Sequence, residues 1–308
     1  MPDFLRLIDP AHRELWSRIQ TTLADGVSCF RMDCVERRGG SNIEGRGLFA
    51  TRDIEATELL AIKGGRIVSE EAVCQMTTDG ILHGSQQQLG ENMFLVGLSS
   101  EEEDLNLVGY NHSCDPNAVV ILPPDVEKEQ VSLLMADRDI TEGEEITVDY
   151  SVSNISNTHR FFCNCGSPEC RRIIQPFTDY LAPHFQERHK GKFPSYIQAR
   201  IDDIGSMPDE ERDRMLFAAQ GIRVMGAIVV LADQVMEELK TRKFLQAKEL
   251  SEGLLMFSNW YVETYSPDPI EGLDYSNKEN LRRSVREKIA LVIADVRLKD
   301  QEFRGYRS

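Results

Sequence analysis

The chain of 308 residues lacks the marks of a membrane or secreted protein. We find no run of the roughly 18 to 20 uninterrupted apolar residues that a membrane span needs, and the N-terminus lacks the basic-then-apolar order of a secretory signal. Basic residues are also scarce, because 35 Lys and Arg stand against 51 Asp and Glu for a formal net charge of -16. We therefore expect an intracellular protein, cytoplasmic or nuclear, that contacts no membrane.

The shortage of basic residues also bears on the partners of the chain. Affinity for nucleic acid rests mainly on clustered Lys and Arg, so we expect no direct nucleic-acid binding. An acidic surface attracts basic proteins or peptides instead, although it would equally serve to keep the protein soluble. Hydrophobic residues make up 41% of the chain, which is enough for a real core in one large domain or in a medium domain with an appendage.

Cysteine is uncommon, and its seven residues are an odd number. Cys163, Cys165 and Cys170 form a C-x-C-x4-C cluster, whose spacing fits metal ligands better than a disulfide framework. A structural Zn²⁺ takes four ligands in a closed tetrahedron, so a fourth ligand must come from elsewhere in the chain. Cys29, Cys34 and Cys74 lack such spacing to a partner, and we expect them to be thiols of the core.

Short apolar runs broken by Gly and Asp predict a β-rich region in the first half of the chain. We expect strands at Ser28–Val35, Gly47–Ala50, Glu58–Ile62, Met93–Val96, Asn117–Leu122, Val131–Ala136 and Glu145–Asp149. A short helix is expected at Asp9–Leu23, with Asp9 as its cap and Pro10 at its start.

From about Pro208 onward, apolar residues recur at spacings of three and four, which predicts three or four helices. Two such stretches are Ile222–Leu239 and Leu281–Leu298, and a loop around Pro267 and Gly272 interrupts them. An amphipathic helical region of this kind could pack on the first domain, form a homodimer or recruit a substrate.

Three further segments precede the cysteine cluster in a fixed order. They are Glu44–Ala50, with a Gly-x-Gly at Gly45 to Gly47, then the string Asn111–Asn117, which contains Cys114, and then the run Gly143–Tyr150. In this order and spacing they resemble the SET-domain protein lysine methyltransferases with post-SET zinc-binding cysteines. The resemblance covers about residues 28 to 175.

The resemblance implies an α+β fold. A β-rich SET domain at residues 28–155 would contain a pseudoknot, formed where the Asn111–Cys114 segment and the chain after Tyr150 cross. A post-SET zinc segment would come next at 156–175 and an α-helical C-terminal region at 176–308, after an N-terminal helical segment at 1–27. Cys114 would be the fourth zinc ligand. The alternative is a zinc knuckle at Cys163–Cys170 that is unrelated to Cys114, which would then be a small buried hydrophobic residue.

The resemblance also assigns cofactor and catalytic residues. S-adenosylmethionine would bind at Gly45, Arg46, Gly47, Tyr110, Asn111 and His112, and Phe162 would stack on its adenine. Taken alone, the Gly-x-Gly is weak and is also typical of a turn before a strand. Tyr150 would orient the lysine amine, although a strand tyrosine often only satisfies its hydroxyl in a core. Many relatives carry Phe or Tyr where this chain has Val148, so the number of methyl groups added stays open.

The function implied is transfer of a methyl group to the ε-amine of lysine in a histone or another basic protein. The lysine amine is almost wholly protonated at pH 7, and a tight apolar channel lowers its pKa. The remaining step is an in-line displacement that needs alignment more than a covalent enzyme intermediate. Two alternatives are a non-catalytic protein-binding scaffold and a methyltransferase that acts on a small amine or peptide.

Overall fold

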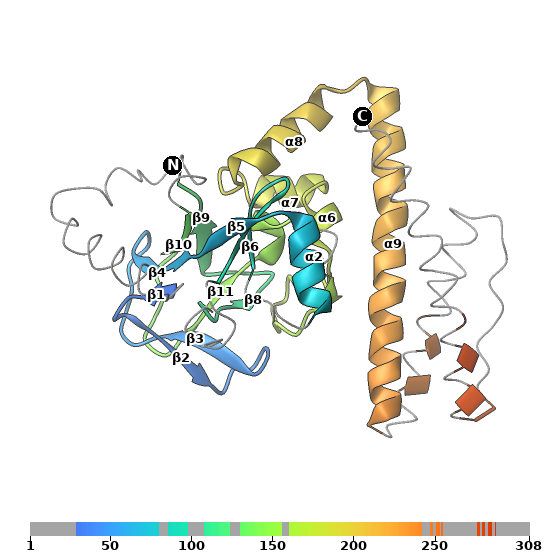
Figure 1. Ribbon diagram of the computed structural model, residues 1–308, viewed down its shortest axis with the longest axis horizontal. Helices are drawn as coiled ribbons and strands as arrows, with labels where there is room; N and C mark the ends of the chain where they lie inside the picture. The colour runs from blue at the N-terminus through green and yellow to red at the C-terminus, as the bar shows by residue number, and fades with distance from the viewer. Residues whose placement is uncertain are drawn as a thin grey trace. The chain divides into compact units, whose positions relative to one another are not determined.

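The computed structural model describes residues 29–79, 86–97, 108–123, 130–155 and 160–241, with short stretches between residues 247 and 287 (Figure 1). The chain forms two compact units that alternate along the sequence. The first unit contains residues 1–158, 163–172 and 183–200, and the second contains 159–162, 173–182 and 201–308. The domain boundaries drawn from the sequence stay predictions.

The strands of the first unit are short and occur mainly before residue 150. They are β1 (Cys29–Arg31), β2 (Val35–Gly39), β3 (Arg46–Ala50), β4 (Leu59–Gly64), β5 (Arg66–Val68), β6 (Gln87–Gly90), β7 (Met93–Val96), β8 (Asn111–His112), β9 (Ala118–Ile121), β10 (Val131–Ala136) and β11 (Glu145–Val148). They form three sheets with the orders β1-β4-β10-β9, β2-β3-β11-β8 and β5-β7-β6 (Figure 1). The β-rich class expected from the sequence is confirmed.

One apolar core lies between the first two sheets. Leu48 in β3, Leu60 in β4 and Ile146 in β11 are fully buried members of it. All six residues of β10 are buried, because this strand lies inside its sheet between β4 and β9. Strands buried on both faces appear in a sequence as largely apolar runs, which explains why β10, apolar except for Ser132, and β7 were predicted with their observed bounds.

The single strand predicted at Ser28–Val35 is wrong, because the chain divides there between two sheets. A turn closed by the Val35 N–H, which donates to Met32 O at 3.2 Å, separates β1 from β2. β1 pairs with β4, whereas β2 pairs with β3. The polar side chains of β2, Glu36, Arg37 and Arg38, hid this strand from a reading based on apolar runs.

Two segments distant in sequence lie side by side in the first unit. β8 pairs in parallel with β11, with Asn111 opposite Thr147 and His112 opposite Val148. The Ser113 N–H extends this pairing by donating to Val148 O at 3.0 Å. The end of β8 therefore lies against the end of β11, just before Tyr150.

The helices described are short except for the last. They are α2 (Glu70–Thr78), α5 (Tyr150–Ser153), α6 (Pro176–Asp179), α7 (Pro183–Arg188), α8 (Ser195–Ser206) and α9 (Asp209–Lys240). In α2, the Ser69 hydroxyl accepts a hydrogen bond from the Ala72 N–H at 3.2 Å, so Ser69 caps the helix. The predicted helix at 9–23 and most of the one at 281–298 lie outside the described residues.

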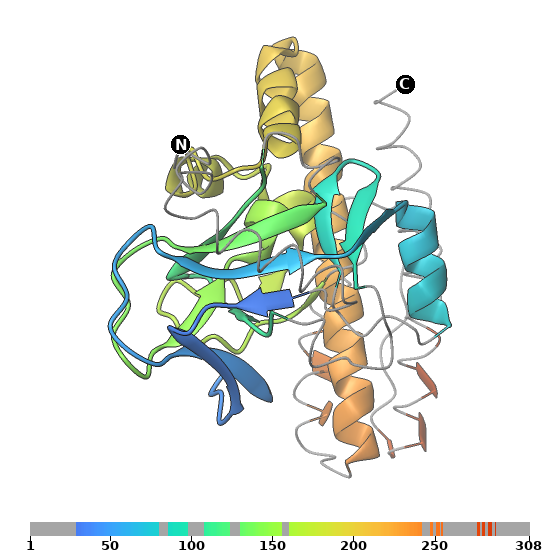
Figure 2. The same ribbon diagram turned by 60° about the vertical axis from the view of Figure 1, so that its left-hand side comes forward.

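The second unit contains β12 (Phe161–Phe162) paired with β13 (Ile173–Ile174), and the long helix α9, drawn in orange in Figure 2. Its apolar face buries Ile228, Leu231 and Val235, which lie within the predicted helical stretch Ile222–Leu239. Acidic residues fill its first turn and Lys240 its last, which suits the helix dipole. The sequence predicted three or four helices from about Pro208 onward. Residues 209–240 of this region form one continuous helix.

A glycine inside α9 marks a close contact in the second unit. The Gln175 amide donates to Arg223 O at 2.7 Å, and a Cβ added to Gly226 would lie 2.0 Å from Gln175 Oε1. Glycine within a helix costs about 1 kcal/mol relative to alanine, so its presence here is explained by the room that Gln175 needs.

By length and composition alone, residues Asp209–Glu238 of α9 could also cross a membrane. The sequence reading missed this possibility because Arg223 and Asp233 interrupt the apolar run. However, 64% of the most apolar window is buried inside the structure, and the core helix of a soluble protein passes the same test. The helix is therefore weak support for a membrane contact.

Candidate functional site

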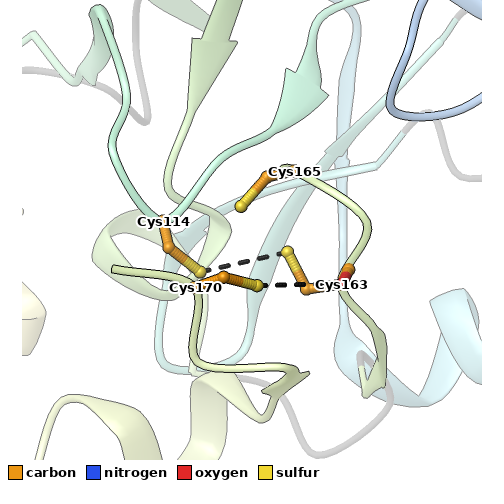
Figure 3. A group of neighbouring side chains, drawn as sticks. All are labelled: Cys114, Cys163, Cys165 and Cys170. Carbon is orange, nitrogen blue, oxygen red and sulfur yellow. Dashed lines mark hydrogen bonds between the residues drawn. The ribbon is translucent and has the colours of Figure 1, made fainter. Parts of the chain in front are cut away.

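The four cysteines singled out in the sequence meet in one place, as Figure 3 shows. Cys114 lies just after β8, and the other three lie between β12 and β13. All four sulfur atoms lie within 4.8 Å of one another, and Cys114 Sγ is 3.9 Å from Cys163 Sγ. Zn–S bonds of about 2.3 Å in a tetrahedron place the sulfurs about 3.8 Å apart, so the four side chains fit such an ion.

The surroundings of Cys114 favour a metal-binding thiolate over a buried thiol. Its sulfur accepts a hydrogen bond from the Arg171 N–H at 3.3 Å and lies 3.4 Å from His112 Nε2. The Cys163 thiol, His112 and the Arg171 N–H hold the pKa of Cys114 well below its usual range. The hydrogen bond with Cys114 raises the pKa of the neighbouring Cys163. Thiolates are the form in which cysteine binds metal.

The remaining cysteines lie apart from this cluster. All seven cysteines are free. Cys29 and Cys34 are buried in the core, as expected, and burial raises the pKa of both thiols. The expectation that Cys74 is a core thiol is wrong, since it lies exposed on α2, on the polar side of a short amphipathic helix.

Tyr150 begins helix α5 directly after β11. Its hydroxyl donates to Tyr110 O at 3.0 Å, and its ring packs edge-to-face on His112 and Tyr110, with ring centroids 5.3 and 6.1 Å away. Burial, followed by the charges around it, raises the pKa of Tyr150 above the normal range, and burial likewise raises that of Tyr110. Both phenols are therefore neutral at pH 7, and each acts as a hydrogen-bond group rather than as a phenolate.

His112 connects this tyrosine to the cysteine cluster. The Tyr150 N–H donates to His112 Nδ1 at 3.1 Å. In a neutral imidazole one nitrogen accepts and the other carries the proton, so this contact places the proton on Nε2, which faces Cys114 Sγ. The ring is buried, with 3% exposed, and acts here through its two hydrogen bonds.

Asn111 lies beside the Gly-x-Gly segment. Its amide nitrogen lies 2.7 Å from Glu145 Oε1 and 3.0 Å from Ser41 Oγ. The carbonyl oxygens of Glu44 and Arg46 lie 3.1 and 3.3 Å from the same nitrogen. An amide nitrogen carries two hydrogens, so four acceptors around it exceed its capacity. Such a group of oxygen atoms, one of them from a carboxylate, suits an ammonium ion.

The glycines of this segment have separate structural reasons. Gly45 adopts a φ of 51°, in the left-handed region that favours glycine. A Cβ added to Gly47 would lie 2.3 Å from Glu145 Oε1, which is itself held by Ser41 and Asn111. A side chain at residue 47 would thus displace the Glu145 carboxylate from the Asn111 amide.

A buried ion pair adjoins Tyr150. The Asp149 side chain is fully buried and accepts hydrogen bonds from Arg171 Nη1 at 2.5 Å and Nη2 at 2.8 Å. Burial alone would raise the pKa of Asp149, but the hydrogen bonds and charge of Arg171 hold it below its usual range. Asp149 Oδ1 also accepts the Ser151 N–H at 3.0 Å and so caps helix α5.

Residues 183–200, which we call the strap, attach to the same unit through polar side chains. Lys192 Nζ lies 2.5 Å from Asp137 Oδ2, Arg200 Nε donates to Glu91 Oε1 at 2.6 Å, and the Tyr196 hydroxyl donates to Ser153 O at 2.8 Å. Arg188 and Asp115 form a further pair at 2.9 Å. Cationic side chains of the strap thus meet carboxylates of the acidic domain.

His189 of the strap is buried against the ion pair, with Nε2 3.6 Å from Asp149 Oδ2. Burial, together with the charges of Lys192, Arg171 and Arg188, lowers the pKa of His189 to about 4, although Asp149 opposes this. An unfolded histidine has a pKa near 6.5. Between these values the unfolded chain takes up a proton that the native state refuses, so stability falls as the pH falls from about 6.5 towards 4.

We therefore expect His189→Phe to make the protein less sensitive to acid. Lowering the pH from 7 to 5 should reduce the unfolding free energy of the parent by about 1 to 2 kcal/mol more than that of the variant. The measurement is the urea midpoint at both pH values. His184→Gln, an exposed histidine of the same strap, is the control and should behave as the parent does. An equal pH effect in the parent and His189→Phe would refute this account.

Of the predicted site residues, the structure brings together the four cysteines and, in a neighbouring region, the group Gly45, Arg46, Gly47, Tyr110, Asn111, His112 and Tyr150. Phe162 lies in β12 of the second unit, so its role at adenine stays a prediction. The sequence reading missed Ser41, Glu145, Asp149 and Arg171. The last three stand within or beside quoted motifs, but their spacing alone gave no sign of their contacts.

Comparisons with known proteins place these residues in context. A profile of the SET domain family matches residues 45–151. Histone-lysine N-methyltransferase trr of Drosophila melanogaster is 29% identical over 138 residues, which are 43% of this chain and 5% of that protein. Histone-lysine N-methyltransferase 2D of Homo sapiens is 31% identical over 137 residues, 43% of this chain and 2% of the human protein. This chain thus spans only a small fraction of these relatives.

A solved structure gives a weaker likeness. The crystal structure of a Plasmodium falciparum protein assigned as a histone methyltransferase is 22% identical and has a TM-score of 0.29. It covers 39% of this chain and 94% of that one. A TM-score this low does not support any conclusion about the fold or function of this chain.

Proposed function

We propose, from the premise that residues 45–151 form a SET domain, that the chain is a protein lysine methyltransferase that uses S-adenosylmethionine. The observation that carries the proposal is the parallel pairing of β8 with β11. It places Asn111, at the group of acceptor oxygens, close to Tyr150, whose hydroxyl binds the backbone next to Asn111. Two paired strands would thus carry both the residues that bind the cofactor and the group that orients the amine.

The acceptor group at Asn111 fits the amino-acid part of the cofactor. Glu145 and the carbonyl oxygens of Glu44 and Arg46 would hold its ammonium, and Ser41 would hold the Glu145 carboxylate in place. When bound, the cofactor supplies a methyl group on a sulfonium. The left-handed turn at Gly45 lets the backbone lie against the ligand.

The lysine side of the reaction rests on Tyr150 and its surroundings. Releasing the proton of a lysine with a pKa near 10.4 costs about 4 to 5 kcal/mol at pH 7, and a desolvated channel reduces this cost. The Tyr150 hydroxyl is held in one direction because it donates to Tyr110 O, and its oxygen would accept an N–H of the amine. Alignment of this kind is what an in-line displacement needs from the protein.

Four cysteines would hold a structural Zn²⁺ that fixes Cys163–Cys170 to the end of β8.

The net charge of -16 favours a histone or another basic protein as substrate. An intracellular location, nuclear or cytoplasmic, and a homodimer through the C-terminal helices stay predictions. Light scattering on a variant of Phe217, which is 51% exposed on α9, would test the homodimer.

The experiment that tests the function is calorimetric titration of the zinc-loaded protein with S-adenosylmethionine. We expect binding in the micromolar range, and a loss of at least about tenfold in Asn111→Ala, because the Asn111 amide holds the Glu145 carboxylate and the carbonyl oxygens of Glu44 and Arg46 together. Asn92→Ala is the matched control, since this exposed asparagine binds only the start of α2. The absence of binding to the parent would contradict a methyltransferase and favour a protein-binding scaffold.

A second step separates the classes of acceptor. Purified protein with labelled cofactor is offered histones, a lysine peptide and free lysine, and the products are analysed by mass spectrometry. Label on the intact basic protein, lost when the acceptor lysines are replaced by arginine, would support a protein lysine methyltransferase. Label on free lysine alone would point to a small-amine methyltransferase instead.

A further inference from the structure

The Arg171 side chain contacts both residues that flank Tyr150. Its guanidinium donates two hydrogen bonds to the Asp149 carboxylate and a third, at 3.3 Å, to the Ser151 hydroxyl. Asp149 is the last residue before helix α5 and Ser151 lies within its first turn. One planar cation therefore holds the backbone on either side of Tyr150.

This contact is shielded from water. The side chains of Asp149 and Arg171 are 0% and 12% exposed, and Ser151 is fully buried. On its other side, the guanidinium lies over the ring of Phe185 from the strap, 4.7 Å from the centroid. A bidentate pair in such surroundings is strong and directional, and lysine cannot reproduce its fork geometry.

The backbone of Arg171 belongs to the cysteine cluster. It is the residue directly after Cys170, and its N–H donates to Cys114 Sγ at 3.3 Å. The same residue thus touches the proposed metal ligands through its main chain and the residues around Tyr150 through its side chain. Its position is set by the cluster, and its charge acts 22 residues away in sequence, on Asp149.

We propose that Arg171 is a positioning residue for Tyr150, which it holds through Asp149 and Ser151. With the pair intact, Asp149 keeps α5 capped and the Tyr150 N–H stays on His112 Nδ1. Without Arg171, the buried carboxylate of Asp149 has no cationic partner that contacts it as closely. Because such a charge is costly to leave uncompensated, the start of α5 must shift or admit water.

A simpler role would be that the pair only fastens the cysteine segment to the domain. The two roles differ in how Tyr150 responds to the loss of Arg171 and to the loss of the metal. If Arg171 only attaches the cysteine segment to the domain, the loss of Arg171 and the loss of the metal should loosen Tyr150 to the same extent. If Arg171 positions Tyr150, the tyrosine loosens in the Arg171 variant even when the cysteine cluster is filled.

The test is hydrogen exchange of the Tyr150 amide in zinc-loaded protein, measured by NMR. In Arg171→Met we expect this amide to exchange about 100-fold faster, since removing one partner of a buried pair is strongly destabilising. The Thr147 amide, which donates to Asn117 Oδ1 at 2.8 Å in the same strand, is the internal reference and should change little. Arg188→Met, which removes an exposed ion pair of the strap, should leave both amides unchanged.

A double variant keeps the test informative if the single one is unstable. Asp149→Asn with Arg171→Met removes both charges, while asparagine retains the helix cap. Exchange at Tyr150 should then return to within about tenfold of the parent, because no uncompensated charge remains. Unchanged exchange at Tyr150 in Arg171→Met, or equal acceleration at Thr147, would overturn the proposal.

Loss of metal in Arg171→Met would require one more comparison. Cys170→Ser lacks a cysteine of the cluster but keeps Arg171, so Tyr150 should exchange faster in the arginine variant than in the cysteine variant. Equal exchange rates would mean that Arg171 only attaches the cysteine segment to the domain.

The proposal rests on the proposed function only in treating Tyr150 as catalytic. Amide exchange requires no cofactor or substrate, so a failed titration with S-adenosylmethionine would leave this test valid.

Discussion

Replacing Tyr150 by phenylalanine is expected to lower methyl transfer by roughly 100-fold or more, the scale on which a positioned polar side chain contributes to catalysis. The substitution removes one hydroxyl, which donates to Tyr110 O, and keeps the ring that packs on His112 and Tyr110. The oxygens around Asn111 and the cysteine cluster do not involve this hydroxyl. Affinity for the cofactor and zinc content should therefore match those of the parent.

The measurement is the steady-state rate of methyl transfer to a basic protein, together with calorimetry of cofactor binding. Tyr196→Phe is a matched control, because the Tyr196 hydroxyl also donates to a backbone carbonyl, Ser153 O at 2.8 Å. Its loss removes a comparable hydrogen bond from the same unit. Activity near that of the parent in Tyr150→Phe, or an equal loss in Tyr196→Phe, would contradict the role given to Tyr150.

The sequence predicted those parts of the fold whose side chains show their burial locally. β7 is a continuous apolar run and β10 is apolar except for Ser132, and the bounds of both were predicted correctly. β6 was not predicted, because Gln87 and Gln88 are buried although they are polar. Their amide oxygens accept hydrogen bonds from distant partners, the Tyr110 hydroxyl at 3.0 Å and the Ile155 N–H at 2.7 Å. No local pattern contains those partners.

The candidate site divides in the same way. The spacing of Cys163, Cys165 and Cys170 indicates a metal by itself, whereas Cys114 was assigned through the family resemblance alone. Glu145 joins Asn111 only because β8 pairs in parallel with β11, and such a pairing between distant segments cannot be read from spacing. The contact of Arg171 with Asp149 depends on the same long-range arrangement.

The cysteine cluster leads to a prediction that separates four ligands from three. Cys114→Ser should lower bound zinc from about one ion per chain to near zero, as Cys170→Ser should, because a closed tetrahedral site needs all four thiolates. Metal binding to such a site contributes folding free energy. We therefore expect Tm to fall by roughly 5 °C or more, since about 1 kcal/mol shifts Tm by 2–4 °C in a domain of this size.

Cys74→Ser is the matched control, because Cys74 is exposed on α2 and lies outside the cluster. Zinc is measured by elemental analysis of protein purified without added metal, and Tm is measured with and without a chelator. The chelator should lower the Tm of the parent and of Cys74→Ser, but not that of Cys114→Ser. Full zinc in Cys114→Ser with none in Cys170→Ser would reduce the site to a knuckle at Cys163–Cys170. The 3.9 Å approach of Cys114 to Cys163 would then be core packing, and the metal would not join the segment to β8.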